Sequence, residues 1–258
     1  MHVSDLVLMN KVERNTFGHF RYLPELLGFS VRKIPELTVV NCGLGTSMFN
    51  IVSNAPHTVG AIDTVISRIV KEFEGQPFAW WLNPHSLPNN INDKFKAHGF
   101  TIDTTEHAMI FDLSKLQGSG HSASALKVEE VVNMRGVGDF AAILSPYDAS
   151  AEPFYKKLIH PSSSIYEKLF VGYEQNVPVA IGILYLEGDT AGVFSLLTQE
   201  DKRGKGYATI MMQHLIHYAK KCGKSYVSLS ASSDAGFRIY KRLGFKIVGQ
   251  FECWEWKG

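Results

Sequence analysis

The segment from Arg203 to Thr209 holds the residues whose types and spacing best suit a chemical role. It reads Arg203, Gly204, Lys205, Gly206, Tyr207, Ala208, Thr209, after an apolar run and before an amphipathic one. The order strand, glycine turn, helix predicts an anion site, because glycines let the backbone bend sharply and approach an anion closely. The N–H groups at the helix start would point at the anion, and Arg203 and Lys205 would add charged donors. Neither the P-loop spacing nor the third glycine of a dinucleotide fingerprint is present.

A second segment, from Ser233 to Phe245, reads as a short helix followed by a turn. Ser233 is a good N-cap residue, Tyr240 falls near the end of the helix, and Gly244-Phe245 forms the turn. The intervening residues 225–230 alternate between polar and apolar, which indicates a strand.

Together the Arg-Gly-x-Gly-x-Ala and Tyr-x-x-x-Gly-Phe segments resemble the acetyl-CoA signature of the GNAT superfamily of N-acetyltransferases, from about Leu126 to the C-terminus. The resemblance implies that acetyl-CoA is the acyl donor and that its phosphates bind the start of the helix. It also implies that the pantetheine arm lies along a strand, with backbone partners, and that Tyr240 protonates the departing thiolate as general acid. The cofactor-binding residues that it implies are Leu196, Leu197, Thr198, Arg203, Gly204, Lys205, Gly206, Tyr207, Ala208, Thr209 and Ser233.

Two positions depart from the family pattern. Asp201 stands where the family often has Gln or Arg, and a carboxylate cannot donate a hydrogen bond to a phosphate. Ser233 stands where Asn is common, so the helix cap is kept while the contact of that Asn with the cofactor is an open point.

Residue types do not identify the general base. The predicted strands over residues 191–198 and 226–232 contain no Asp, Glu or His. A base acting through water ranks first, and Asp148 or Glu152, in the early helical region, ranks second. Glu187 and Asp189 bound a turn and are predicted to lie at a solvated tip.

Composition excludes several classes of protein. The 258 residues are 45% apolar, and 26 basic residues against 25 acidic ones give a formal charge of +1. This near-neutral charge does not indicate a basic surface that would bind nucleic acid or an anionic membrane. The sequence has neither a signal-like pattern nor an apolar run long enough to span a bilayer. Cys42, Cys222 and Cys253 are widely spaced, without metal-ligand spacing, so we expect reduced thiols, no metal and a cytoplasmic location.

A small, polar, glycine-containing stretch over residues 114–124 reads as a linker. It predicts two domains, a degenerate GNAT-like domain over residues 1–118 and an acetyl-CoA-binding catalytic domain over residues 125–258. The second domain reads as an α/β (α+β) fold with a mixed sheet. Its predicted strands cover residues 126–132, 168–173, 179–186, 190–198, 226–230, the surroundings of Ile247, and 252–256; its predicted helices cover residues 134–144, 152–159, 205–222 and 234–242.

The N-terminal half repeats the order of the C-terminal half. Residues 95–102 align with residues 240–247, and each is followed by an apolar strand. In the N-terminal half, strand, helix and strand patterns precede this segment over residues 47–53, 61–73 and 77–82. Phe95 takes the place of Tyr240, and residues 54–60, which lack Arg and Lys, take the place of the glycine turn. We interpret this half as a GNAT-like copy without a cofactor site; the alternative is that any α/β half can end in helix, Gly-Phe and strand.

These observations predict an N-acetyltransferase that transfers the acetyl group of acetyl-CoA to a primary amine of a small molecule or peptide. The predicted reaction is direct attack in a ternary complex. The alternative is a non-catalytic acyl-CoA-binding or partner-binding protein, because a fold does not fix a function. A third reading, an aminoacyl- or peptidyl-transferase, would require basic grooves for tRNA, which the near-neutral charge disfavours. The acceptor and the oligomeric state cannot be read from the sequence.

Overall fold

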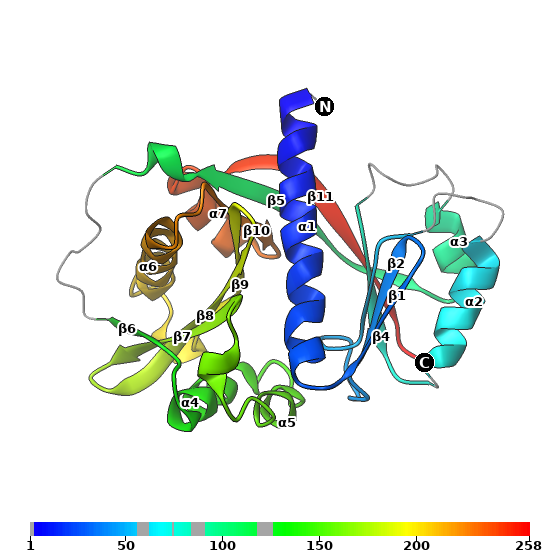
Figure 1. Ribbon diagram of the computed structural model, residues 1–258, viewed down its shortest axis with the longest axis horizontal. Helices are drawn as coiled ribbons and strands as arrows, with labels where there is room; N and C mark the ends of the chain where they lie inside the picture. The colour runs from blue at the N-terminus through cyan, green and yellow to red at the C-terminus, as the bar shows by residue number, and fades with distance from the viewer. Residues whose placement is uncertain (1–2, 56–61, 74, 84–90, 118–125) are drawn as a thin grey trace. The chain divides into compact units, whose positions relative to one another are not determined.

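A computed structural model describes residues 3–55, 62–73, 75–83, 91–117 and 126–258 (Figure 1). The chain forms two compact units that are interleaved in sequence. Unit 1 comprises Met1–His19 and Met109–Val248, and unit 2 comprises Phe20–Ala108 and Gly249–Gly258. The domains predicted from the sequence are consecutive, so this exchange of the two chain ends is a feature that the sequence analysis does not anticipate.

Unit 1 contains a sheet in the order β10-β9-β8-β7-β6. Neighbouring strands are antiparallel except for β9 and β10, which are parallel. A parallel pair needs a crossover connection, and α6 provides it. The strands are β6 (Lys127–Glu130), β7 (Glu167–Glu174), β8 (Val177–Glu187), β9 (Thr190–Thr198) and β10 (Tyr226–Ala231); the helices are α4 (Met134–Leu144), α5 (Ala151–Tyr155), α6 (Tyr207–Lys221) and α7 (Asp234–Arg242), with short 3₁₀ helices at Leu113–Lys115, Pro161–Ser163 and Glu200–Lys202.

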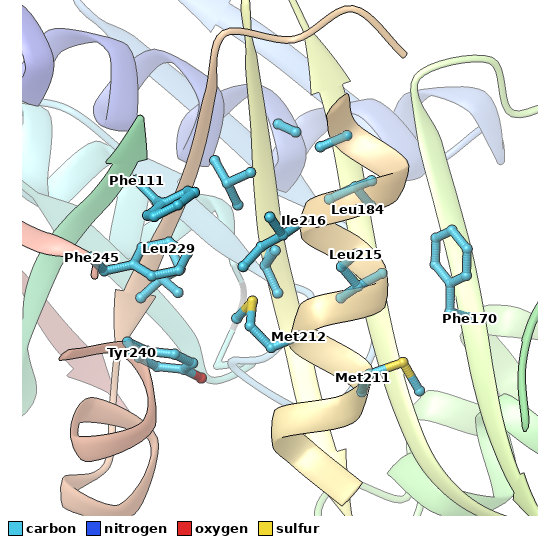
Figure 2. Close-up of a cluster of buried hydrophobic side chains, with 14 of the residues drawn as sticks. Phe111, Phe170, Leu184, Met211, Met212, Leu215, Ile216, Leu229, Tyr240 and Phe245 are labelled. Carbon is cyan, nitrogen blue, oxygen red and sulfur yellow. The ribbon is translucent and has the colours of Figure 1, made fainter. Parts of the chain in front are cut away.

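The core of unit 1 lies between the sheet and α6 (Figure 2). Met212, Leu215, Ile216 and Ala219, which recur at helical spacing along one face, are buried. Each fully buried Leu, Ile or Met side chain contributes about 1.5–3 kcal/mol relative to an exposed one. This packing fixes the N-terminus of α6, where the glycine turn lies, against the end of β9.

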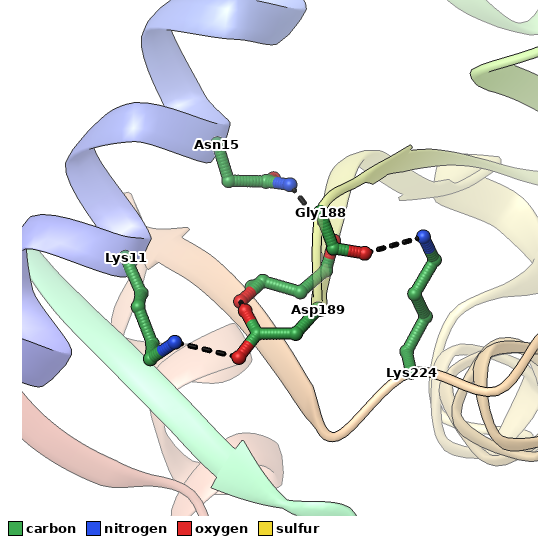
Figure 3. Close-up of polar contacts among 6 residues, drawn as sticks. Lys11, Asn15, Gly188, Asp189 and Lys224 are labelled. Carbon is green, nitrogen blue, oxygen red and sulfur yellow. Dashed lines mark hydrogen bonds and ion pairs between the residues drawn. The ribbon is translucent and has the colours of Figure 1, made fainter.

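Helix α1 (Val3–Leu26) contributes its residues up to His19 to unit 1. The buried Asn15 amide donates to the Thr190 carbonyl oxygen at 3.1 Å, and Lys11 Nζ lies 2.6 Å from Asp189 Oδ2 (Figure 3). A Cβ atom at Gly192 would lie 1.9 Å from Asn15 Oδ1, and one at Gly18 would lie 2.6 Å from a Glu187 oxygen. Glycine at both positions therefore permits the close approach of α1 to β8 and β9.

The contact with α1 corrects one prediction. The turn bounded by Glu187 and Asp189 is not a purely solvated tip, because α1 packs on it through Lys11 and Gly18. Lys224 also binds this turn, since its Nζ donates to the Gly188 carbonyl oxygen at 2.8 Å (Figure 3).

Unit 2 contains a sheet in the order β1-β2-β3-β4-β11. Strands β3 and β4 are parallel and joined through α2, and the other pairs are antiparallel. An aromatic core lies around Phe95, whose ring centroid is 4.9 Å from those of Trp80 and Phe100. The elements are β1 (Ser30–Ile34), β2 (Leu37–Asn41), β3 (Ile51–Ser53), β4 (Phe78–Leu82), α2 (Ile62–Glu72) and α3 (Ile91–Ala97); β5 (Thr101–Asp112) and β11 (Lys246–Trp256) each run from one unit into the other along the chain.

The two turns that the sequence alignment equates have the same hydrogen bonds. The Phe100 N–H donates to the Phe95 carbonyl at 3.0 Å, and the Phe245 N–H donates to the Tyr240 carbonyl at 3.0 Å. Gly99 and Gly244, which precede the two Phe residues, both have positive φ, 83° and 93°. The local equivalence of Phe95 and Tyr240 is thus visible in the backbone, while the degenerate repeat as a whole stays a prediction.

Several predicted boundaries are wrong. The two final strands are one continuous strand, β11, because Gly249 continues the extended backbone rather than breaking it. Helix α5 ends at Tyr155 instead of residue 159, and the strand expected from residue 47 begins at Ile51. Residues 56–60 of the segment that replaces the glycine turn, and residues 118–124 of the linker, lie outside the described residues.

Candidate functional site

The glycine turn connects β9 to α6 as the sequence predicts, although the helix begins at Tyr207 rather than Lys205. Gly204 and Gly206 both have φ of 81°, a left-handed conformation that favours glycine. No atom lies within 4 Å of a Cβ built at either residue, so the backbone conformation, not crowding, requires glycine there. Gly206 caps α6 without a side-chain hydrogen bond, which leaves the first N–H groups of the helix for an anion.

The side chain of Arg203 is held at the edge of the turn. Its Nη2 donates to the Tyr147 hydroxyl at 2.6 Å, and its Nε donates to the Thr198 carbonyl at 3.4 Å. Arg203 is thereby placed beside the end of β9, and Ala208 follows, half-buried, in the first turn of α6.

A carboxylate that the sequence analysis did not single out lies in this cluster. Glu174, at the end of β7, accepts hydrogen bonds from Lys202 Nζ at 2.9 Å, from Lys205 Nζ at 3.0 Å and from the Tyr207 hydroxyl. The bonds from Tyr207, Lys202 and Lys205 lower the pKa of Glu174 to about 2, and the bond to Glu174 raises the pKa of Tyr207. Lys205 therefore faces a negative charge in this form of the protein, and an incoming phosphate would compete with that carboxylate.

Strand β9 has an irregular edge just before the turn. Its register with β8 shifts between Phe194 and Leu197, and Ser195 has φ of 46°. The ladder between β9 and β10 ends at the Val193–Leu229 pair. Beyond it, Leu196 and Thr198 have no partner in the β10 ladder within residues 126–258, which the structure describes without a gap.

This stretch of β9 also holds an unsatisfied polar atom. Thr198 Oγ1 is buried without a hydrogen-bond partner, and such atoms are uncommon in proteins. An unpaired strand edge, an orphan hydroxyl, two left-handed glycines and adjacent cations are what an extended, amide-rich, phosphate-bearing molecule needs. The residues present therefore fit coenzyme A.

Tyr240 lies on α7, and its side chain belongs to the core cluster that contains Met212 and Phe245. The residue is 9% exposed, and Figure 2 shows its hydroxyl pointing from α7 toward α6. A Cβ at Gly236 would lie 3.2 Å from that hydroxyl oxygen, so Gly236 makes room for it. Helix α7 starts as predicted, because Ser233 Oγ accepts a hydrogen bond from the Gly236 N–H at 3.2 Å.

The two carboxylates ranked as possible bases are engaged elsewhere. Asp148 accepts a hydrogen bond from the Ser150 N–H at 2.8 Å in the turn before α5. Glu152 forms an ion pair with Lys156 at 2.7 Å, and both side chains are more than half exposed.

Neither a metal cluster nor a membrane-spanning helix is found among the described residues. No group of three or more His, Cys, Asp or Glu side chains there could hold a metal ion, and no described helix is both long and apolar enough to cross a bilayer. A polar hollow of about 270 Å³ lies between β6 and the start of α4, lined by residues such as Glu130 and Arg135. None of its lining residues belongs to the glycine turn or to β9.

The sequence profile of the acetyltransferase (GNAT) family matches residues 134–245. This range includes β9, the glycine turn, α6 and α7, so the GNAT resemblance drawn from the two segments is confirmed there. The uncharacterized N-acetyltransferase CgeE of Bacillus subtilis (strain 168) is 23% identical over 174 residues, which are 63% of this chain. The match spans 65% of the length of that relative.

Solved structures show the same fold over nearly the whole chain. A GCN5-related N-acetyltransferase from Kribbella flavida has a TM-score of 0.72 at 17% identity and covers 96% of both chains. A tandem GNAT protein from the clavulanic acid biosynthesis pathway has a TM-score of 0.56 at 9% identity, over 91% of this chain and 87% of its own. The predicted α/β fold with a mixed sheet is confirmed.

Proposed function

We propose that this protein is an N-acetyltransferase that moves the acetyl group of acetyl-CoA to a primary amine of a small molecule or peptide. The amine attacks the thioester directly while both substrates are bound. The proposal rests mainly on three features that follow one another from the end of β9 to the start of α6. An unpaired edge of β9 leads into a left-handed glycine turn, which leads into the uncapped start of α6.

Each proposed donor-binding residue has a distinct contribution. N–H groups from Gly204 to Thr209 and the Lys205 ammonium would hold the phosphates, and the backbone of β9 at Leu196, Leu197 and Thr198 would pair with the pantetheine amides. Acetyl-CoA supplies an activated carbonyl and a thiolate leaving group. Tyr240 would protonate that thiolate, while Ser233 fixes the start of the helix that carries Tyr240.

Loss of the two cations of the turn should weaken donor binding. Replacing Arg203 and Lys205 by Ala removes two charged contacts, and each such bond is worth about 1.5–3 kcal/mol. Calorimetry with acetyl-CoA should show a Kd at least about tenfold higher. The matched control replaces Arg242 and Lys221, which are exposed on α7 and at the end of α6, by Ala. Equal Kd values for the two double variants would refute the assignment of the phosphate site.

Loss of the carboxylate that competes for Lys205 should have the opposite effect. Glu174→Gln keeps the side-chain shape but no longer neutralises Lys202 and Lys205. On the scale of exposed ion pairs, acetyl-CoA should bind roughly two- to fivefold more tightly at low salt, and the gain should shrink as salt screens the charges. The exposed Glu129→Gln on β6 is the control of equal charge; weaker binding by Glu174→Gln would show that the carboxylate assists the site.

The second candidate is a non-catalytic acyl-CoA-binding protein on the same fold. It predicts tight binding without turnover, so a thiol-release screen over classes of amine separates it from the enzyme. Tyr240 and the complete Arg-Gly-Lys-Gly turn favour the enzyme. In unit 2 the equivalent of Tyr240 is Phe95, fully buried among aromatic rings. We therefore place transfer chemistry in the C-terminal half alone.

A further inference from the structure

His19 and Glu167 form a pair that the sequence analysis did not identify. His19 Nδ1 lies 2.8 Å from Glu167 Oε2, and the imidazole stacks on the Phe194 ring with centroids 3.8 Å apart and planes 12° apart. The Glu167 side chain is 1% exposed, whereas that of His19 is 16% exposed. The Glu167 carboxylate is thus shielded from solvent, whereas the His19 imidazole is partly exposed.

The sheet and α1 together fix the position of this pair. Glu167 on β7 is in register with Tyr185 on β8, which is in register with Gly192 on β9. Residues in register lie on the same face of a sheet, and α1 crosses this face by means of Gly18 and Gly192. Helix packing, and not a surface loop, therefore determines where the His19 ring lies.

Glu167 has unused hydrogen-bonding capacity. Its Oε1 is buried without a hydrogen-bond partner, and burying a carboxylate is costly unless it is paired. Burial and the nearby charge of Glu167 raise the pKa of Tyr155 on α5. A carboxylate kept in such surroundings is typical of a group that orients and stabilises a cation, and His19 is the partner that the structure provides.

The imidazole also lies close to the proposed path of the acyl donor. Its stacking partner, Phe194, directly precedes Ser195, where β9 becomes irregular and loses β10 as a neighbour. Leu196, where the pantetheine arm is proposed to pair, follows Phe194 by two residues on the same strand. An amine held beside the ring would therefore lie near the acyl end of the donor.

We propose that His19 is the general base that deprotonates the acceptor amine, and that Glu167 is the positioning residue that orients it. The inference rests on the proposed acetyl transfer and supplies the base which that reaction lacks. An Nδ1–H donated to Glu167 makes Nε2 the proton acceptor. The interaction has the form in which catalytic histidines are commonly oriented by a carboxylate.

The protons balance as follows. An ammonium group gives one proton to His19 Nε2, and its nitrogen then forms the bond to the acetyl carbonyl carbon while the carbon–sulfur bond breaks. The nitrogen loses its second proton to water as the amide forms, and the thiolate takes a proton from Tyr240. Tyr240 then regains a proton from solvent and His19 gives one up to solvent, so the products are one amide, one thiol and one proton released.

Among the described residues, the titratable groups near this pair include Tyr185 and Glu187 on β8, and Tyr155 on α5, which lies near Glu167. Tyr185 is 6.1 Å from the His19 ring, centroid to centroid, and its hydroxyl donates to Glu187 at 3.3 Å. Histidine changes charge between about pH 5 and 8, and only its neutral form can accept a proton. The rate of transfer should therefore fall toward acid.

The test compares two isosteric variants with a matched control. His19→Asn keeps a donor near Glu167 but cannot accept a proton, and Glu167→Gln removes the charge. The control, His98→Gln, alters another histidine–carboxylate pair, in which His98 Nε2 lies 3.1 Å from Asp63 Oδ1 in unit 2. Thiol release from acetyl-CoA is followed from pH 5 to 9, with the best amine of the screen and with water alone, and calorimetry gives the Kd of acetyl-CoA.

We expect kcat/KM of His19→Asn to fall by about 10²–10⁴, the usual contribution of general base catalysis, with the Kd of acetyl-CoA within twofold of wild type. The fall toward acid should disappear in this variant. In Glu167→Gln kcat/KM should also fall, because an amide orients the imidazole less firmly than a carboxylate does. Added imidazole should restore part of the activity of His19→Ala and leave Glu167→Gln unchanged, which a merely structural role would not produce.

Wild-type kcat/KM in His19→Asn would overturn the inference and leave the proposed function standing. The same holds if His98→Gln loses as much activity as His19→Asn, or if imidazole fails to rescue His19→Ala while thermal unfolding shows that the variant is folded. If the wild-type protein binds acetyl-CoA but releases no thiol with any amine or with water, the proposed function fails, and the role of His19 fails with it.

Discussion

Replacing Tyr240 by Phe should lower kcat by about 10²–10⁴ while leaving the Kd of acetyl-CoA nearly unchanged. A general acid typically contributes this much, and the ring packing against Met212 and Phe245 survives the loss of one oxygen. Stopped-flow measurement of thiol release separates the chemical step from substrate binding.

The control for Tyr240 is another tyrosine of the same unit. Tyr173→Phe on β7 also removes one hydroxyl, which donates to Asp139 at 2.9 Å, and should leave kcat much closer to the wild-type value. If Tyr240→Phe turns over at the wild-type rate, with chemistry shown to be rate-limiting, Tyr240 is only a core residue.

Deleting residues 1–120 should leave a poorly soluble fragment, although the fragment retains the entire family match. Residues up to His19 belong to unit 1, and Met9 and Val12 of α1 are fully buried. Each such side chain contributes about 1.5–3 kcal/mol, against a total stability of about 5–15 kcal/mol for a typical domain. The deletion also removes β4, the partner of β11, and exposes an apolar strand edge.

Two Val→Ala substitutions on α1 test the contribution of this helix to stability without truncating the chain. Val12→Ala removes buried methyl groups and should destabilise the full chain by about 1–2 kcal/mol, since each buried CH₂ is worth about 0.8 kcal/mol. Val7→Ala, at a position 54% exposed, should change the free energy of unfolding little. Full acetyl transfer by a soluble fragment of residues 121–258 would show that α1 is dispensable.

Local patterns in the C-terminal half determine its elements closely. Helices α4 and α7 and strand β9 have the predicted bounds, because each combines clear periodicity with a cap or turn residue, such as Asn133 and Ser233. The turn conformations of Gly204 and Gly206 also follow from their residue type. These are local properties, and a single sequence reveals them.

The features of the fold that the sequence does not predict depend on contacts between residues far apart in sequence. Helix α1 buries polar residues, Asn15 and Thr16, which interrupt the apolar stripe by which helices are usually found. Its packing in unit 1 depends on Gly18 and Gly192, which are 174 positions apart. The sequence around either glycine does not by itself indicate a helix–sheet contact. The two end strands merge because Gly249 accepts an extended conformation within β11.

The same reason explains which site residues were overlooked. Glu174 closes β7 before a two-residue hairpin, and only the fold brings it to Lys202 and Lys205. Glu167 stands one residue before the predicted strand, and His19 lies in a helix without a prediction. A search for a base confined to the strands beside the thioester could find neither.

The most direct test of the account is a structure of the protein with acetyl-CoA bound. We predict the pyrophosphate on the N–H groups that follow Gly204, with Lys205 moved from Glu174 toward it. The pantetheine amides should pair with β9 at Leu196 and Thr198, and the sulfur should lie within hydrogen-bonding distance of the Tyr240 hydroxyl. Density for the cofactor near Phe95, or an empty turn at saturating acetyl-CoA, would contradict the account.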